Sequence, residues 1–153
     1  MFKPNQKTSI PDSKGVDFVS QPLMKRWIHV EFVKEGVHCY PAAATDPNLA
    51  TGEWDDVSFL ASPHFHYFTF KVTVEVFQND RDIEFIQFSR WCQRLYDQGV
   101  MKLNSQSCEM LAESLIGRIA DKYKGRDIKV SVLEDNINGA TLEYVKAIPV
   151  QTI

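Results

Sequence analysis

Two of the four histidines, His64 and His66, stand two residues apart in a segment where apolar and polar residues alternate. Successive side chains of a β-strand point to opposite faces, so residues two apart share a face and both imidazoles are expected on one side of a strand. Two neutral imidazoles on one face can supply two ligands of a tetrahedral zinc ion. The spacing therefore predicts part of a metal site, although such pairs are also typical of surface histidines that bind nothing.

A third ligand can come from His38 or from His29. The segment Arg26 to His38 (RWIHVEFVKEGVH) is expected to be a strand, and His64 opens the next expected strand. Antiparallel pairing brings the end of the first strand to the start of the second, which favours His38. His29 lies about 30 Å from His38 along an extended chain, at about 3.3 Å per residue. Three histidines leave a fourth position for water or substrate, as in catalytic zinc sites, whereas the alternative is that His29 and His38 are ordinary strand histidines.

Two further polar residues stand at the ends of expected elements. Glu134 ends a strand, where a carboxylate can accept two parallel hydrogen bonds from a guanidine-like edge such as that of a pterin or guanine. The residues alone favour a simpler interpretation, in which Glu134 is a solvated acid of a hairpin. Ser107 precedes an expected helix, so its hydroxyl can cap that helix or contact a bound ring.

The elements that must position these side chains form an α+β fold in the order β-β-α-α-β-β. We expect a four-stranded antiparallel sheet with two helices on one face. The open edges of such a sheet predict oligomerisation. Residues 1–23, rich in proline and polar residues, are expected to form an extended arm, and residues 24–153 a single domain with a long loop at 39–63. The expected elements are strands at 26–38, 64–77, 127–134 and 140–148, helices at 86–98 and 108–123, and a hairpin connection at 135–139 that ends in Asn-Gly.

Composition narrows the functional classes. The chain has 153 residues, of which 44% are hydrophobic and 24% charged, as in one globular domain. The net charge of −3 and the lack of a basic stripe argue against a nucleic-acid partner. No membrane span or secretory signal is apparent, so we expect a cytoplasmic protein without a membrane partner. Three widely spaced cysteines, Cys39, Cys92 and Cys108, fit reduced thiols rather than disulfides.

These motifs, taken in order, resemble the 6-pyruvoyl-tetrahydropterin synthase and 6-carboxy-tetrahydropterin synthase family, whose fold is the tunnelling fold, or T-fold. In that family a zinc-binding His-x-His opens the second strand, as His64-Phe65-His66-Tyr67 does here, and a histidine that ends the first strand is the third ligand. The other matching segments are Asp82-Ile83-Glu84-Phe85, Leu103-Asn104, Ser107-Cys108-Glu109-Met110-Leu111-Ala112 and Val132-Leu133-Glu134-Asp135.

The resemblance implies a Zn²⁺ cofactor on His38, His64 and His66, and a pterin-like or purine-like ligand that Glu134 anchors and Ser107 contacts. It implies a lyase-type or related step of pterin or deazapurine metabolism. It also implies that the sheets of several subunits join edge to edge into a barrel, as a trimer or a hexamer, with ligand pockets between subunits.

Two departures from the family pattern concern its catalytic groups. The segment Phe59 to Pro63 has no thiol where family enzymes place their cysteine, so Cys39, next to His38, is the candidate catalytic thiol. The family's Asp-His pair reads Asp97-Gln98 here, so Asp97 is the second catalytic candidate, and the amide beside it cannot act as a base. The alternative to an enzyme is therefore a catalytically inactive T-fold protein that binds a ligand or acts as a scaffold.

Overall fold

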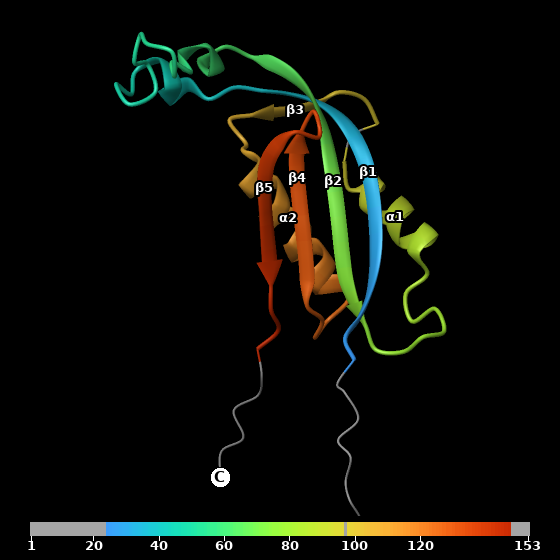
Figure 1. Cartoon of the computed structure of the whole chain (residues 1–153). Coiled ribbons are helices and arrows are strands. Elements are labelled where there is room, and N and C mark those ends of the chain that lie inside the picture. The colour runs from blue at the N-terminus through green and yellow to red at the C-terminus, as the bar shows by residue number, and fades with distance from the viewer. Residues whose placement is uncertain (1–23, 97, 148–153) are drawn as a thin grey trace, which may run out of the picture.

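The structure is a computed structural model that describes residues 24–96 and 98–147 (Figure 1). The arm expected at residues 1–23 and the candidate Asp97 lie outside these residues. The elements are β1 (Arg26–His38), the 3-10 helices η1 (Pro41–Ala44) and η2 (Ser58–Ala61), β2 (His64–Val76), α1 (Phe85–Arg94), β3 (Met101–Asn104), α2 (Cys108–Lys122), β4 (Ile128–Glu134) and β5 (Asn138–Tyr144).

Strands β1 and β2 form the centre of the sheet, and each is 13 residues long. They pair antiparallel from Arg26 opposite Val76 to His38 opposite His64. Alternating apolar residues put one face of this long ribbon in the core, where Phe68, Phe70 and Val72 are fully buried. The predicted pairing of the end of the first strand with the start of the second is confirmed.

The sheet differs from the predicted one in size and direction. It has five strands in the order β3-β1-β2-β4-β5, and β3 runs parallel to β1, so the sheet is mixed and not purely antiparallel. The additional strand, Met101–Asn104, is four residues long and, within the described part of the chain, pairs only with Gly36, Val37 and His38. The expectation of four antiparallel strands was therefore wrong in this respect, while the α+β class is confirmed.

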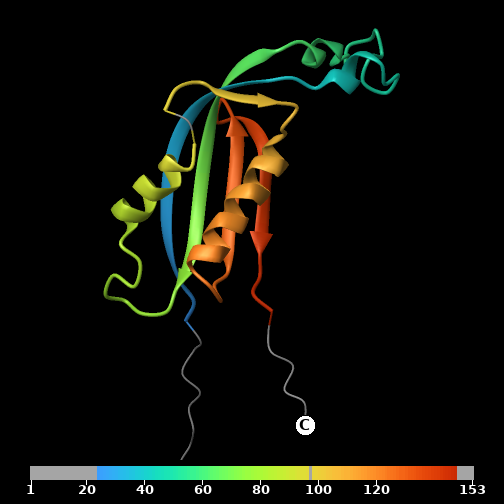
Figure 2. The same cartoon turned by 180° about the vertical axis from the view of Figure 1, so that it is seen from behind.

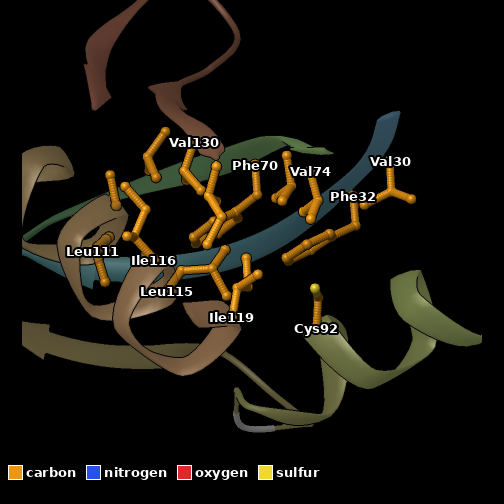
Figure 3. Packing of buried hydrophobic residues seen from close by; sticks show 14 of the residues in the cluster. Val30, Phe32, Phe70, Val74, Cys92, Leu111, Leu115, Ile116, Ile119 and Val130 are labelled. Atoms are coloured by element: carbon orange, nitrogen blue, oxygen red, sulfur yellow. The ribbon is translucent and has the colours of Figure 1, made fainter. Parts of the chain in front are cut away.

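Both helices lie on one face of the sheet, as Figure 2 shows from behind. The hydrophobic core fills the space between that face and the helices. In Figure 3, Leu115 and Ile119 of α2 and Cys92 of α1 point toward Phe70 and Phe32 of the sheet. Each of these five side chains is buried, so burial of apolar surface fixes both helices against the strands that carry the histidines.

Side-chain caps explain where both helices begin. Ser107 caps α2, because its hydroxyl accepts a hydrogen bond from the backbone N–H of Met110 at 3.3 Å, as predicted. The Glu84 carboxylate caps α1 by accepting from the N–H groups of Ile86 and Gln87. Helix α1 ends at Arg94, four residues before the predicted end.

The hairpin between β4 and β5 turns at Asp135 and Asn136 and not at the Asn138-Gly139 pair that the sequence favours. Asp135 and Asn136 have φ values of 51° and 57°, as a type I′ turn requires. Gly139 lies inside β5, where a Cβ atom would be 2.0 Å from the backbone oxygen of Val132. The glycine is therefore needed for the close approach of β4 and not for the turn.

The predicted long loop at residues 39–63 extends beyond the sheet from the joined ends of β1 and β2. Both views show it projecting past the β5 side of the molecule, whereas α1 lies on the β1 side (Figures 1 and 2). Its two strand-proximal ends are held together, because the N–H of Tyr40 donates to the carbonyl of Leu60 at 2.6 Å. We call residues 39–63 the projecting loop.

In residues 24–96 and 98–147, no helix combines the length and the apolar character needed to cross a lipid bilayer.

Candidate metal centre

His38, His64 and His66 meet at the upper end of the β1–β2 ribbon. One ring nitrogen of each lies within 4.8 Å of those of the other two. The ring centroids of His38 are 4.6 Å from His64 and 5.3 Å from His66. The two strands position all three on the helix-covered face, because His38 is paired with His64 and His66 follows two residues later.

Each imidazole is oriented by an acceptor at its Nδ1 atom. Nδ1 of His38 donates to the carbonyl of Gln106 at 3.1 Å, and Nδ1 of His64 donates to the carbonyl of Ser62 at 2.7 Å. Nδ1 of His66 donates to the carboxylate of Asp135 at 2.6 Å. These oxygens can only accept, so the proton of each ring belongs on Nδ1 and the lone pair on Nε2. This outer contact is typical of histidines that bind metals.

The Nε2 atoms of His38 and His66 are buried and have no hydrogen-bond partner among the residues that the structure describes. A buried polar nitrogen without a partner carries a desolvation penalty of about 1–3 kcal/mol, so native proteins rarely leave one in place. A metal ion bound between the rings would satisfy both lone pairs at once. The residues present therefore fit a metal ion, and the cluster could hold one.

Glu134, at the end of β4, borders the two unpartnered nitrogens. Its Oε1 lies 3.2 Å from Nε2 of His38 and its Oε2 3.5 Å from Nε2 of His66, without the geometry of a hydrogen bond. Ligands of a tetrahedral zinc ion, each about 2.0–2.1 Å from the metal, are about 3.3 Å apart. The carboxylate is thus close enough to contact an ion held by the histidines or a molecule bound beside that ion.

A cavity of about 260 Å³ opens next to this cluster. Its walls come from the ends of β1 and β4, from the start of α2 and from the base of the projecting loop. The lining includes His38, His64 and Glu134, together with Cys39, Tyr40, Leu60, Ser105, Gln106, Ser107, Cys108, Glu109, Asn138 and Gly139. A ligand in this cavity would therefore touch the histidine cluster and the Glu134 carboxylate together.

The cavity is lined by two of the three free cysteines. Cys39 is half-buried, and its backbone N–H donates to the carbonyl of Asn104 at 2.8 Å. Cys108 is buried with its Sγ 3.7 Å from Oε1 of Glu134. Burial, helped by that carboxylate, raises the pKa of the Cys108 thiol to about 12, so Cys108 is a neutral thiol at pH 7 and a poor nucleophile.

The predicted site residues are only partly brought together. His38, His64, His66, Glu134, Ser107 and Cys39 all border the cluster or its cavity, whereas Asp97 lies outside the described residues. His29, the disfavoured third ligand, is an exposed residue of β1, and its Nδ1 lies 3.3 Å from the Thr73 hydroxyl. The catalytic roles of Cys39 and Asp97 and the ligand-binding roles of Glu134 and Ser107 stay predictions.

Sequence reasoning missed the outer contacts of the histidines. Asp135 follows Glu134 directly. An acid at a hairpin turn next to a strand that carries histidines is the signal that could have indicated the contact of Asp135 with His66. The carbonyls of Ser62 and Gln106 give no such signal, because every residue type carries a backbone carbonyl. Cys108 was not named as a site residue, since its position at the cavity depends on the packing of α2.

Comparisons with known proteins support the fold and no more. No family model matches the sequence, and no curated protein matches it. Among solved structures, the chain is similar to an uncharacterized protein, WS1659, from Wolinella succinogenes, with a TM-score of 0.52 and 14% identity. The alignment covers 78% of this chain and 98% of that chain.

Proposed function

We propose that the protein is a divergent zinc-dependent member of the 6-pyruvoyl/6-carboxy-tetrahydropterin synthase type that binds a pterin-like or purine-like heterocycle. The observation that carries the proposal is the arrangement of the three imidazoles: each Nδ1 atom faces an acceptor, and one ring nitrogen of each histidine lies within 4.8 Å of those of the other two. Zinc in its catalytic sites takes three protein ligands and leaves a fourth position open, which three histidines provide.

The position of Glu134 supports the heterocycle part of the proposal. A carboxylate can accept two parallel hydrogen bonds from adjacent N–H groups, and the edge of a pterin or guanine presents such a pair. The Glu134 side chain is 28% exposed, so it is accessible from the cavity yet sheltered from bulk water. The cavity of about 260 Å³ is slightly below the usual range of ligand pockets, which starts at about 300 Å³. A second subunit at its mouth would enlarge it.

In this proposal the bound zinc supplies a Lewis acid that polarises an oxygen of the ligand. The protein's own residues do the rest. Glu134 fixes the ring, Ser107 lies at the start of α2 where its hydroxyl borders the same cavity, and Cys39 is the thiol available for proton transfer. We propose a lyase-type or related step for this arrangement.

The second candidate is a catalytically inactive T-fold protein that binds a ligand or acts as a scaffold. Two features of the sequence favour it. Gln98 carries an amide that cannot titrate where the family pattern has a histidine, and the segment Phe59 to Pro63 has no thiol where the family pattern has its cysteine. In both candidates the protein binds a metal ion and a heterocyclic ligand. They differ in whether the bound ligand is chemically converted.

We further propose that the protein is a trimer, or a hexamer of two trimers. Strand β5 is an edge of the sheet, and β3 covers only the last residues of β1, so unpaired backbone groups remain along both sides of the described sheet. Such edges are usually paired or covered in native proteins.

The ring-binding proposal is tested by titrating pterin and guanine into zinc-loaded protein and measuring the heat of binding. We expect Glu134→Gln to weaken binding at least tenfold, because an amide cannot accept two hydrogen bonds from adjacent N–H groups. Glu143→Gln, an exposed change on β5, is the matched control and should leave the affinity unchanged. Equal affinity of wild type and Glu134→Gln, or no binding of either compound, would remove the heterocycle from the proposal.

His64→Ala separates the two candidates. An enzyme should lose turnover while circular dichroism and the melting temperature show an intact fold. A scaffold should lose its metal but keep its contacts with partner subunits.

A further inference from the structure

The projecting loop has a composition unlike that of the rest of the chain. It contains four acidic residues, Asp46, Glu53, Asp55 and Asp56, and neither lysine nor arginine. Trp54, near the middle of its sequence, is 95% exposed. Trp is among the residues that contribute most when they become buried in protein interfaces, so an almost fully exposed Trp indicates a docking element.

Internal hydrogen bonds hold the segment around Trp54 in a defined shape. The N–H of Gly52 donates to Oδ2 of Asp56 at 2.7 Å, and the hydroxyl of Thr51 donates to Oδ1 of Asp55 at 2.9 Å. The hydroxyl of Ser58 also donates to Asp56. This bond, together with the one from the N–H of Gly52, keeps the pKa of Asp56 below its ordinary value. The loop therefore presents Trp54 among ionised carboxylates from a pre-organised turn, which lowers the entropy cost of docking.

A basic cavity lies on the opposite side of the molecule. It has a volume of about 220 Å³ and is lined by Lys34 of β1 together with Arg90, Gln93, Arg94 and Gln98 of α1 and the residues after it. Within residues 24–96 and 98–147, the side chains of Arg90 and Arg94 make no hydrogen bond or ion pair, although the charge of Arg90 helps to lower the pKa of Glu84. Two guanidinium groups at a cavity can stack on an aromatic ring and pair with carboxylates.

The two features lie at opposite edges of one sheet. The projecting loop passes beyond the β5 side, and α1, with the basic cavity, lies beside β1 (Figures 1 and 2). A copy placed next to the β5 edge in the same orientation turns its β1 side, and with it α1, toward the loop. Such a head-to-tail contact uses two different surfaces and closes into a ring when the rotation between copies permits.

We propose that the projecting loop of one copy docks on the basic cavity of a second copy of this chain, with Trp54 stacked on Arg90 or Arg94 and Glu53 and Asp55 paired with the same guanidinium groups. The proposal rests on the homo-oligomer proposed above and names the surfaces that build it. It is independent of the metal, since no residue of the histidine cluster takes part.

The test measures self-association of the full chain by sedimentation equilibrium over a range of protein and salt concentrations. We expect Trp54→Ala, and separately the double variant Arg90→Glu with Arg94→Glu, to weaken association at least tenfold. High salt should weaken association of the wild type, because exposed charge pairs are screened. Met110→Ala, an exposed apolar change on α2, and Arg118→Glu, an exposed charge change on α2, are matched controls and should associate like the wild type.

Mixing the two variants gives the sharper result. The Trp54→Ala chain keeps an intact basic cavity, and the Arg90→Glu/Arg94→Glu chain keeps an intact loop. If these surfaces are partners, the intact loop of one variant docks on the intact cavity of the other. An equimolar mixture then forms dimers, whereas each variant alone associates weakly. Circular dichroism of each variant verifies folding before mixing.

Three outcomes would overturn the proposal. In the first, both variants associate as strongly as the wild type, which rejects these surfaces and leaves the oligomer standing. In the second, both variants lose association and the mixture does not restore it, which shows that the surfaces contact something other than each other. In the third, the wild type is a monomer, which rejects the oligomer as well, while zinc binding stays testable by itself.

Discussion

Asp135 accepts a hydrogen bond from Nδ1 of His66 at 2.6 Å. The same carboxylate accepts the N–H of Tyr67 at 3.0 Å, and the bond to His66 is the main cause that holds the pKa of Asp135 below its ordinary value. Asp135 therefore fixes both the position of the strand next to His66 and the orientation of the ring. The residue before it, Glu134, lies on the opposite nitrogen of that ring, so two consecutive acids enclose one imidazole.

Replacing Asp135 should weaken metal binding without removing a ligand. We expect Asp135→Ala to lower zinc affinity by about 10–100-fold, since loss of the outer partner frees the ring and reduces the basicity of Nε2. Asp135→Asn should lose less, because an amide oxygen still accepts from Nδ1 and asparagine tolerates the φ of 51°. Zinc competition titrations measure this. Asp121→Ala, which alters an exposed acid on α2, is the control, and an affinity for zinc in Asp135→Ala equal to that of the control would contradict the assignment.

Gly36 makes room for the ring that supports the cluster. A Cβ atom at Gly36 would lie 2.7 Å from Cε2 of Phe68, and the Phe68 ring stands edge-on to His38 with centroids 5.2 Å apart. We expect Gly36→Ala to lower the free energy of unfolding by about 1–3 kcal/mol through overpacking, and to weaken zinc binding as Phe68 shifts.

Gly117→Ala is the matched control for that change. Gly117 lies in α2, and apart from the helix's own backbone no atom of the described residues lies within 4 Å of an added Cβ, so the substitution should stabilise the helix by about 0.5–1 kcal/mol. Urea unfolding measures both variants. A Gly36→Ala protein as stable as the wild type would show that the Phe68 ring is not confined by β1.

The ion pair of Asp82 with Arg126 should make stability depend on pH. Oδ2 of Asp82 accepts from Nη1 of Arg126 at 2.8 Å and from the N–H of Phe77 at 2.7 Å, and the bond from Arg126 is the main cause that lowers the pKa of Asp82. A carboxyl with a lowered pKa stabilises the folded state fully above its ordinary pKa of 3.8, and this stabilisation is lost as the pH falls through the folded-state pKa.

We therefore expect Asp82→Asn to cost about 1.5–3 kcal/mol at pH 7, the range for hydrogen bonds to charged groups, and progressively less below about pH 4. Unfolding by urea from pH 3 to pH 7 gives both curves. Asp80→Asn should change stability by less than about 1 kcal/mol throughout, because its pair with Arg81 is exposed. A constant difference between Asp82→Asn and wild type across this range would contradict the assigned role.

The alternation of apolar residues predicted the β1–β2 ribbon and, with it, the meeting of His38, His64 and His66. That prediction succeeded because a period of two fixes the face of every residue once the pairing is known. Strand β3 was missed because its four residues, Met101 to Asn104, are too few to show a period. Its parallel pairing with β1 also depends on contacts far apart in the sequence. The end of α1 at Arg94 was missed because the apolar pattern continues to Leu95 although the helix does not.

The predicted site was most complete where side chains carry the chemistry. Imidazoles and carboxylates are visible in a sequence, so the three histidines and Glu134 could be named. The contacts that orient them could not, because the carbonyls of Ser62 and Gln106 depend on how the chain turns before β2 and α2. The hairpin connection at 135–139 was predicted, but the position of the turn at its first two residues was not, since Asn-Gly is the stronger hairpin signal by residue type.

We propose that His38, His64 and His66 hold one zinc ion per chain through their Nε2 atoms. The most direct measurement is zinc K-edge X-ray absorption, with metal content, on protein purified without chelators, beside His64→Ala and the control His29→Ala. We expect one zinc per chain with three imidazole nitrogens at about 2.0–2.1 Å in the wild type and in His29→Ala, and loss of that signal in His64→Ala. Zinc at background level in the wild type, or an unchanged spectrum in His64→Ala, would contradict it.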